Sequence, residues 1–424
     1  MASVRKAFLN QLRPHDPAPE ELYVDWLSAL GLDDVKQVIV NCITGADVST
    51  QVLVTGQRGS GKSTELRRAV DALRAASCFV SLQSGEFVEE LGGDIAASDI
   101  VYFAAQQLVS DLQKNGLTSA GGAAWEGFWS EIKKKATSLG VEVKGPGGVG
   151  FGLSLKDNPG LRRELRQLFG QHQSQFLRVV NEEIVLPAMK ALKEHGTERI
   201  VMIVDGLGDV PLRSAGDPVH PERTNHEQIF VDNGDLLAGF ACDVVYTFPV
   251  ELAYQSVRLG NGSRGEVLEL GVIPLSRRDG SPTAGADSMR AILERRATSV
   301  GGTIGELVVA ADVDRLVALS GGHLRTVFEL LQTAIHRAGP TGEGTLDSAA
   351  VDRAIRLRAD ALNKTLLDTH RAALDHVRQH RTPPPDDLRR AFNELLQSQH
   401  VLAYYDVGGT WFAPHPLTDP AVLA

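Results

Sequence analysis

The sequence predicts an α/β fold with a mostly parallel, helix-flanked sheet, followed by a helical region and a small C-terminal module. Three observations support this prediction. Five short apolar runs are separated by helical patterns, a glycine-rich turn joins the first run to a helix, and the pattern from about residue 274 onward is helical. Apolar strands that alternate with helices are typical of a parallel sheet that is buried on both faces.

The length and composition are those of a multidomain globular protein. The chain has 424 residues, of which 43% are hydrophobic and 23% charged, and this length favours two to three domains. The patterns predict an N-terminal helical segment (1–45), an α/β core (46–274), a helical lid (275–363) and a winged-helix-like domain (364–424).

Several classes of protein are disfavoured by the composition. No run approaches the roughly 18 apolar residues that a membrane span needs, and the first residues lack the apolar core of a signal peptide. Cys42, Cys78 and Cys242 are isolated and odd in number, which is typical of buried thiols in a reducing compartment. We therefore expect a cytoplasmic protein without membrane contact. The formal charge of −10 also disfavours broad nucleic-acid binding.

The strongest motif begins directly after the apolar run 51–55, which reads as a short buried strand. It is a full G-x-x-x-x-G-K-[ST] match, and a helical pattern follows it over 65–73. In a phosphate loop of this kind the glycines let successive backbone N–H groups point at phosphate oxygens. The helix that follows directs its positive end at the same anion. The residues expected to contact the nucleotide are Gly56, Gln57, Arg58, Gly59, Ser60, Gly61, Lys62, Ser63 and Thr64.

The motif also predicts ATP and Mg²⁺ as ligands. Lys62 is expected to reach the β- and γ-phosphates, and the Ser63 hydroxyl is placed to ligate Mg²⁺. The alternative, a glycine turn before a surface helix, does not require the Gly-Lys-Ser triplet in register.

A second strand is expected at 78–82, and Ser98 is a candidate N-cap for the helix that follows. Residues 115–160 resemble an insertion, because period-two alternation flanks the Gly145-Pro146-Gly147-Gly148 turn. This hairpin could contact a partner, or it could simply pack on its own domain. A long helix is then expected to begin at Asn158-Pro159.

The most apolar strand, 200–204, ends at Asp205. Phosphate-loop ATPases keep an acid at this position to hold the Mg²⁺ shell, and the alternative is an ordinary turn aspartate. Gly206 cannot activate water, so Asp209 is the nearest candidate for that role, against a loop-capping role.

Two further polar residues are candidates for the site. Thr247 lies inside the apolar strand 243–248 and could bond the γ-phosphate or the attacking water, or could be a buried threonine satisfied by backbone. A fifth strand is expected at 267–270, and helices at 287–299, 313–319 and 324–335. Arg325 lies at the start of the last of these helices, where the helix dipole disfavours a cation. Its position therefore predicts a nearby anion, either a nucleotide phosphate or a carboxylate.

The C-terminal residues 364–424 predict two helices and two short strands, 401–405 and 410–413, around Asp406-Val407-Gly408-Gly409. Helices followed by a hairpin are typical of a winged-helix-like module.

Taken together, these residues resemble the AAA+/STAND division of phosphate-loop ATPases over about residues 45–424. The resemblance is carried by the phosphate loop, by Asp205-Gly206-Leu207, by Thr247 in a strand that ends at Pro249, and by Arg325 after Ser320-Gly321-Gly322. It implies an ATP-driven switch, with Thr247 as its polar sensor and Arg325 as its second sensor. Any arginine finger would come from a neighbouring subunit, with Arg223, Arg277, Arg278, Arg295 and Arg296 eligible by composition.

Three functions remain open at this level. The first is an ATP-dependent switch whose self-association or protein contacts change with nucleotide state, for which the resemblance suggests bacterial defence or signalling. The second is a DNA-handling ATPase similar to replication initiators or transposition regulators, which the near-neutral C-terminal module disfavours. The third, a small-molecule kinase, is disfavoured by the lid and the C-terminal module.

Overall fold

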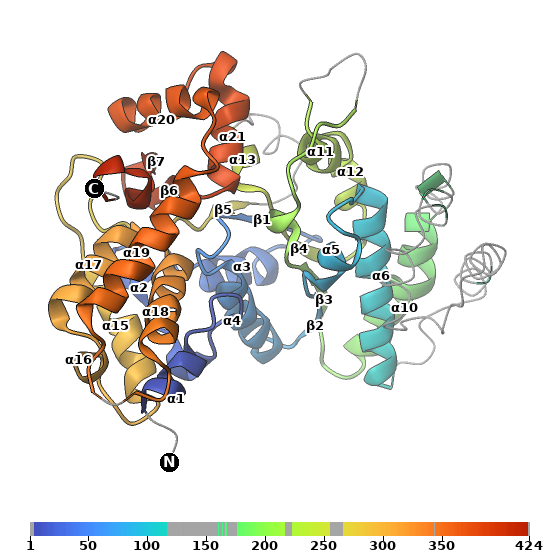
Figure 1. Ribbon diagram of the computed structural model, residues 1–424. Helices are drawn as coiled ribbons and strands as arrows, with labels where there is room; N and C mark the ends of the chain where they lie inside the picture. The colour runs from blue at the N-terminus through green and yellow to red at the C-terminus, as the bar shows by residue number, and fades with distance from the viewer. Residues whose placement is uncertain are drawn as a thin grey trace. The chain divides into compact units, whose positions relative to one another are not determined.

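The computed structural model describes residues 4–116, 130, 160, 163, 166–167, 176–216, 223–254, 266–342 and 344–422. The chain forms two compact units (Figure 1). The first, which we call the phosphate-loop unit, comprises residues 1–35, 56–65 and 269–424. The second, the sheet unit, comprises residues 36–55 and 66–268. Each unit is described by itself below.

Among the described residues, the sheet has five strands in the order β2-β3-β4-β1-β5, and the pairs β2–β3, β3–β4 and β4–β1 are all parallel. Its strands are β1 (Gln51–Thr55), β2 (Cys78–Gln83), β3 (Arg199–Val204), β4 (Asp243–Phe248) and β5 (Val267–Glu269). The predicted strands and the predicted mostly parallel sheet are confirmed. This is the α/β fold of P-loop NTPases, with the glycine-rich loop between the first strand and a helix.

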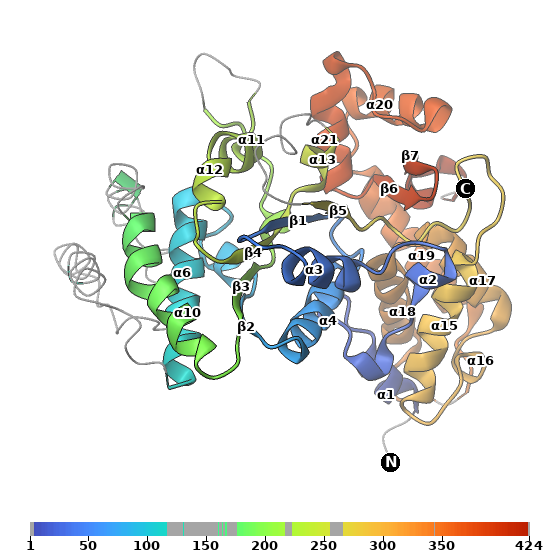
Figure 2. The same ribbon diagram turned by 180° about the vertical axis from the view of Figure 1, so that it is seen from behind.

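Helices cover both faces of the sheet, because alternate residues of the central strands are apolar on both sides. On one face, α6 (Ala97–Lys114) and α10 (Leu186–Lys193) pack on residues such as Met202 and Tyr246. Seen from behind, α3 (Val35–Thr44) and α4 (Lys62–Ala75) lie over the other face (Figure 2). Shorter helices complete the unit: α5 (Glu86–Glu90), η2 (Asn181–Val185), η3 (Leu207–Asp209), α11 (Asn225–Glu227), η4 (Gln228–Asp232), α12 (Gly234–Leu237) and α13 (Val250–Ala253).

The predicted N-cap at Ser98 is wrong. Helix α6 begins at Ala97, so Ser98 lies inside its first turn. The N-terminal end is capped by Asp99, whose carboxylate accepts the backbone N–H of Ala96 at 2.9 Å. An acid in the first turn also suits the positive end of the helix dipole. The local pattern showed a helix start but not which polar side chain caps it.

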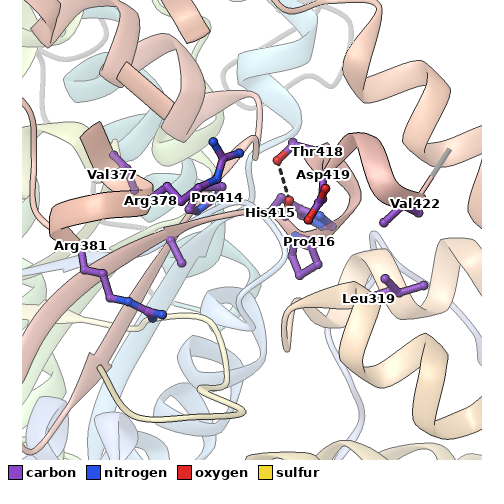
Figure 3. Close-up of a pocket in the computed structure, with 11 residues that line it drawn as sticks. Leu319, Val377, Arg378, Arg381, Pro414, His415, Pro416, Thr418, Asp419 and Val422 are labelled. Carbon is purple, nitrogen blue, oxygen red and sulfur yellow. Dashed lines mark hydrogen bonds between the residues drawn. The ribbon is translucent and has the colours of Figure 1, made fainter. Parts of the chain in front are cut away.

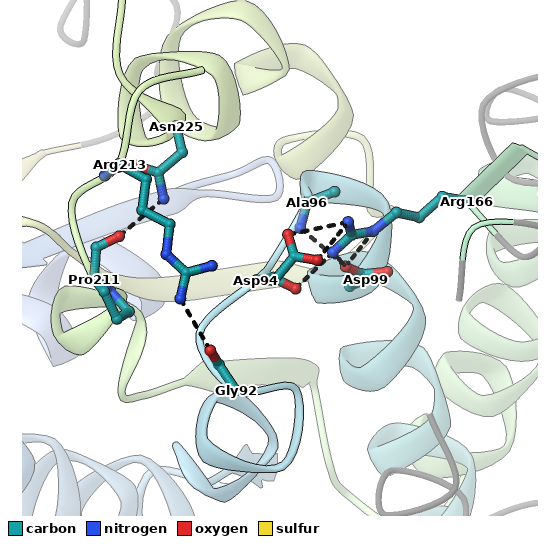
Figure 4. Close-up of polar contacts among 8 residues, drawn as sticks. All are labelled: Gly92, Asp94, Ala96, Asp99, Arg166, Pro211, Arg213 and Asn225. Carbon is teal, nitrogen blue, oxygen red and sulfur yellow. Dashed lines mark hydrogen bonds and ion pairs between the residues drawn. The ribbon is translucent and has the colours of Figure 1, made fainter. Parts of the chain in front are cut away.

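The loop before α6 is fixed by an arginine from a distant segment (Figure 4). Arg166 donates to Asp99 at 2.8 Å and to Asp94 at 3.2 Å. Burial raises the pKa of Asp99, and the guanidinium of Arg166 partly offsets that effect. The predicted hairpin of the 115–160 insertion and the predicted start of the next helix at Asn158-Pro159 lie outside the described residues, whereas the later part of that helix is present from residue 176 through η2 to the end of α10 at Lys193.

The phosphate-loop unit is mainly helical. Its larger helices are α1 (Val4–Gln11), α2 (Trp26–Ala29), α15 (Gly285–Thr298), α16 (Ile304–Leu307), α17 (Ala310–Ser320), α18 (Leu324–Ala338) and α19 (Ser348–Asn363). The helices predicted at 287–299, 313–319 and 324–335 are present as α15, α17 and α18. Short turns occur at η1 (Glu20–Leu22), η5 (Asp386–Leu388), η6 (Pro416–Thr418) and η7 (Pro420–Val422).

Residues 364–424, which we call the C-terminal module, contain two helices and an antiparallel hairpin. These are α20 (Asp368–His380), α21 (Arg389–Gln397), β6 (Val401–Asp406) and β7 (Gly409–Pro414). The rings of Tyr404 and Trp411 stack across the hairpin with centroids 4.2 Å apart. The Tyr404 hydroxyl donates to the carbonyl of Gly321 at 2.7 Å, so the module packs on the end of α17 in the same unit. Across the described part of the chain, no helix has the length and apolar character of a membrane span.

Candidate functional site

The predicted phosphate loop lies between the end of β1 at Thr55 and the start of α4 at Lys62. Gly56, Gly59 and Gly61 have φ angles of +152°, +89° and +106°, and all three lie in the region that L side chains rarely adopt. The N–H of Ser60 donates to Gln57 at 3.0 Å and closes a tight turn. The glycines therefore set the curvature that a phosphate cradle needs.

Lys62 arches back over this loop. Its Nζ atom donates to the carbonyls of Gly56 at 2.6 Å and Gln57 at 3.0 Å, and only 8% of the residue is exposed. The ammonium group is thus held against the loop at the positive end of α4. A fixed cation beside oriented N–H groups is an arrangement that binds anions.

The side chain of Gln57 is buried in the C-terminal module. Its Nε2 atom donates to the carbonyls of Leu396 at 3.0 Å and Val401 at 2.6 Å. Its Oε1 atom accepts the N–H of Ala403 at 2.8 Å. Both amide hydrogens and the amide oxygen therefore have partners, and the residue is 2% exposed.

The next carbonyl of the loop, that of Arg58, accepts two side-chain hydrogen bonds. His323 donates through Nε2 at 2.7 Å, and Gln399 donates through Nε2 at 2.9 Å. Nδ1 of His323 accepts the N–H of Thr326 at 3.3 Å, so the imidazole is neutral with its proton on Nε2. Burial, together with the nearby cations, lowers the pKa of His323 to about 4.

Arg325 lies beside the loop. A Cβ atom on Gly59 would come within 2.7 Å of the Arg325 Cβ atom. The Arg325 Nε atom donates to the carbonyl of Pro14 at 3.0 Å. The N-terminal segment also contacts the loop helix, because Ala18 donates its N–H to the Thr64 hydroxyl at 3.0 Å.

The acidic residues predicted for the site belong to the sheet unit. Asp205 follows β3 directly, and its carboxylate accepts the N–H of Gly206 at 2.7 Å. Gly206 has a φ of +83°, and a Cβ atom there would lie 2.3 Å from the Cα atom of Gly85. Only glycine fits this turn, which fixes the direction of the chain after Asp205. Asp209 ends the short η3 turn, and its N–H donates to Gly206 at 3.0 Å.

Thr247 connects this turn to the adjacent strand β4. Its hydroxyl is fully buried and accepts the N–H of Leu207 at 3.0 Å. Within the sheet unit, the structure therefore brings Thr247 together with the turn that carries Asp205 and Asp209.

A buried histidine–glutamate pair, which was not predicted from the sequence, anchors the far end of the turn. His226 donates through Nε2 to the carbonyl of Val210 at 2.9 Å, and its Nδ1 atom shares a hydrogen bond with Glu251. Both side chains are at most 1% exposed. The dipeptide His226-Glu227 lacks the second histidine of a zinc motif, and no pattern in the sequence marks Glu251.

The segment after the turn is also held in place (Figure 4). Asn225 donates to the carbonyl of Pro211 at 3.0 Å, and Arg213 donates to the carbonyl of Gly92 at 3.2 Å. A Cβ atom on Gly93 would lie 2.6 Å from Pro211. The chain from Asp205 to Arg213 is thus fixed at both ends.

One cavity of the phosphate-loop unit is distinct from the phosphate loop (Figure 3). It has a volume of about 360 Å³ and lies between the end of α17, helix α20 and the C-terminal residues. Arg378, Arg381 and Asp419 line it, and Thr418 donates to the His415 carbonyl at 2.7 Å at its edge. No residue of the phosphate loop is among its lining residues.

One arginine that was eligible as a finger is buried. Arg296 is 6% exposed, lies over the ring of Phe328 at 4.6 Å, and donates to the carbonyl of Ile292 at 3.1 Å. Burial lowers its pKa to about 10. A side chain packed in this way does not extend from the surface, so Arg296 is unsuited to reach a neighbouring subunit.

Matches to known proteins come from solved structures. No family model matches the chain, and no curated protein sequence matches it. Among solved structures, a variant of Thermotoga maritima RuvB is 12% identical, covers 95% of both chains and has a TM-score of 0.37. The structure described as the Thermotoga maritima RuvB Holliday junction branch migration motor is also 12% identical over 95% of both chains, with a TM-score of 0.34.

Proposed function

We propose that this chain is an ATP-binding, Mg²⁺-dependent ATPase of the AAA+ type. It would act as a switch whose nucleotide state changes its self-association or its contacts with a partner protein. The observation that carries the proposal is the conformation of the phosphate loop. Gly59 and Gly61 adopt positive φ angles, and Lys62 opens α4 with its ammonium held over the loop. A turn that only joins a strand to a helix needs neither the two positive φ angles nor a lysine ammonium held over it.

The residues present fit a magnesium nucleotide. The Ser60 hydroxyl is buried and, among the described residues, has no hydrogen-bond partner, so the loop retains a polar atom that a phosphate could satisfy. Lys62 and the loop N–H groups would bind phosphate, while Ser63 and Asp205 would hold Mg²⁺. Bound Mg²⁺ would neutralise the charge that develops on the phosphates. Asp209 would orient the attacking water, and Thr247 and Arg325 would sense the γ-phosphate.

The topology of the sheet supports a role for the turn at residues 205–210, which we call the acidic turn. Strands β1, β4 and β3 are parallel neighbours, with Thr55 paired to Phe248 and Val204 to Tyr246. The residue before the phosphate loop and the residue before Asp205 therefore end at the same edge of the sheet. Ligands of open α/β sheets bind at this carboxyl edge.

The charge of the C-terminal module gives no support to the DNA-handling alternative. Residues 364–424 hold six Lys or Arg against seven Asp or Glu. Several of these cations are already paired within their own helix, such as Arg378 with Asp375 at 2.6 Å and Arg390 with Glu394 at 3.1 Å. Strong, salt-dependent binding of duplex DNA in an anisotropy titration would favour the alternative.

The central test is Lys62→Ala. Because the variant lacks the ammonium that would bind the β- and γ-phosphates, we expect MgATP binding measured by calorimetry to fall by at least about 100-fold, in line with a desolvated charge-assisted contact. The matched control is Arg67→Ala, which removes a cation from an exposed position on the same helix. Equal affinities for the parent protein and Lys62→Ala would refute the proposal.

A further inference from the structure

The phosphate loop is linked to the C-terminal module through a residue that the motif leaves unspecified. Gln57 is a variable position of the motif, yet its side chain makes three hydrogen bonds to the end of α21 and to β6. Two of them go to carbonyls and one comes from an N–H, so only a carboxamide satisfies all three. A carboxylate could not donate, and an alkyl side chain would leave three buried backbone groups unpaired.

A second contact runs in the opposite direction, from the module to the loop. Gln399 donates to the carbonyl of Arg58 at 2.9 Å, next to the bond from His323. Gln399 has a φ of +64°, a conformation that is unfavourable for residues other than glycine and asparagine. The residue is 8% exposed, so its amide is largely removed from water. A strained backbone is thus retained where its side chain reaches the phosphate loop, as is common at functional positions.

We propose that Gln57 and Gln399 are positioning residues through which the C-terminal module holds the phosphate loop in its binding conformation. Nucleotide affinity then depends on the docking of this module. By linkage, bound nucleotide stabilises the docked module to the same extent. This inference rests on the proposed nucleotide binding and identifies the C-terminal module as the part of the chain that regulates the same site. A partner that pulled the module away would weaken nucleotide binding.

The variant Gln399→Gly separates this role from a structural one. Glycine relieves the strain at positive φ, so a purely structural role predicts an unchanged or higher Tm and an unchanged affinity. Our proposal predicts an unchanged or higher Tm together with a Kd for MgATP that is weaker by about threefold to tenfold, the effect of one lost hydrogen bond. The matched control is Ser77→Gly, an exposed residue of the sheet unit with a φ of +60°, which should leave the Kd unchanged.

Hydrogen exchange on the unmodified protein gives a second test that does not depend on how a variant folds. We expect MgATP to slow the exchange of the Ala403 amide, which is bonded to Gln57. Slower exchange in residues 58–65 with no change at Ala403 would overturn the inference while supporting nucleotide binding. No change in either place would instead count against the proposed function. An unchanged Kd in Gln399→Gly would likewise overturn the positioning role.

Discussion

The phosphate loop and the acidic turn, residues 205–210, are the two halves of the predicted nucleotide site, and they are supported in different ways. The loop is held by His323 and Gln399, which lie 265 and 341 positions from Arg58 in the sequence. The turn is held by Thr247, 40 positions from Leu207, and by His226, 16 positions from Val210. The loop conformation is therefore linked to the folding of the C-terminal module, whereas the turn depends on its own sheet.

The two units also differ in their buried ionisable groups. In the phosphate-loop unit, burial lowers the pKa values of His323, His400 and His415. In the sheet unit, burial raises the pKa values of the carboxylates Asp99 and Asp243. Through these groups, a fall in pH should therefore destabilise the phosphate-loop unit and stabilise the sheet unit.

The largest effect is expected at the buried pair that anchors the acidic turn. Glu251→Ala leaves His226 without its partner in the core of the sheet unit, and loss of one member of such a pair costs about 3–5 kcal/mol. Glu251→Gln keeps a polar partner for the imidazole and should cost less, about 1 kcal/mol. Urea unfolding measures both values. If the two variants were equally stable, the pair would not be the anchor.

A smaller effect is expected from the protonation of His323, which should lower the free energy of unfolding by about 3 kcal/mol, since one pKa unit corresponds to about 1.36 kcal/mol. In the unfolded chain this histidine binds a proton near its ordinary pKa of 6.5, while in the folded protein it does so only near a pKa of about 4. Stability from this group is fully present above pH 6.5 and is lost as the pH falls towards 4. In the folded protein the pKa of Asp99 is raised above its ordinary value of 3.8. Its contribution to stability is therefore fully present below pH 3.8 and is lost as the pH rises above that value.

The variant His323→Gln tests this difference. Glutamine can still donate to the Arg58 carbonyl but does not titrate, so the loss of unfolding free energy between pH 6.5 and pH 4 should become smaller. Asp99→Asn is the counterpart in the sheet unit and should change the pH dependence in the opposite direction. Identical pH profiles for His323→Gln and the parent protein would contradict the assignment.

Much of the fold could be predicted because the signals are local. The apolar strands, the glycine-rich loop and the C-terminal hairpin each occupy a short stretch with its own periodicity or turn residues. The position of Asp205 at the end of β3 follows from the same patterns. The cap of α6 was misplaced because Ser98 and Asp99 are neighbours and both can cap a helix.

What supports the site could not be predicted, because it depends on tertiary contacts. Gln57 occupies a position of the motif that any residue can fill, and only the structure shows its amide inside the C-terminal module. The positive φ of Gln399 has no signature in the sequence, since glutamine seldom adopts it. The motif therefore predicts the presence of a phosphate loop, but not what holds it.

A smaller effect than those of Glu251→Ala and of His323 protonation, and the sharpest comparison of the two halves, is expected for Asp205→Asn. The substitution removes a charge that would hold Mg²⁺ but leaves the phosphate loop and its hydrogen bonds intact. We expect ATP turnover to fall by about 10-fold to 100-fold, the usual effect of disturbing a metal's supporting residues, while the Kd for nucleotide changes little. Steady-state rates over a range of Mg²⁺ concentrations, with calorimetry alongside, measure both quantities.

Asp209→Asn is the matched control for this prediction, because it alters a second carboxylate of the same turn. If Asp209 orients the attacking water, its loss lowers turnover without changing the Mg²⁺ dependence, whereas the loss of Asp205 raises the Mg²⁺ concentration needed for half-maximal rate. An unchanged rate in Asp205→Asn would show that this residue only shapes the turn through its bond to Gly206. Nucleotide affinity would then depend on the phosphate loop and on the residues that hold it, and Asp205 would have no part in ATP hydrolysis.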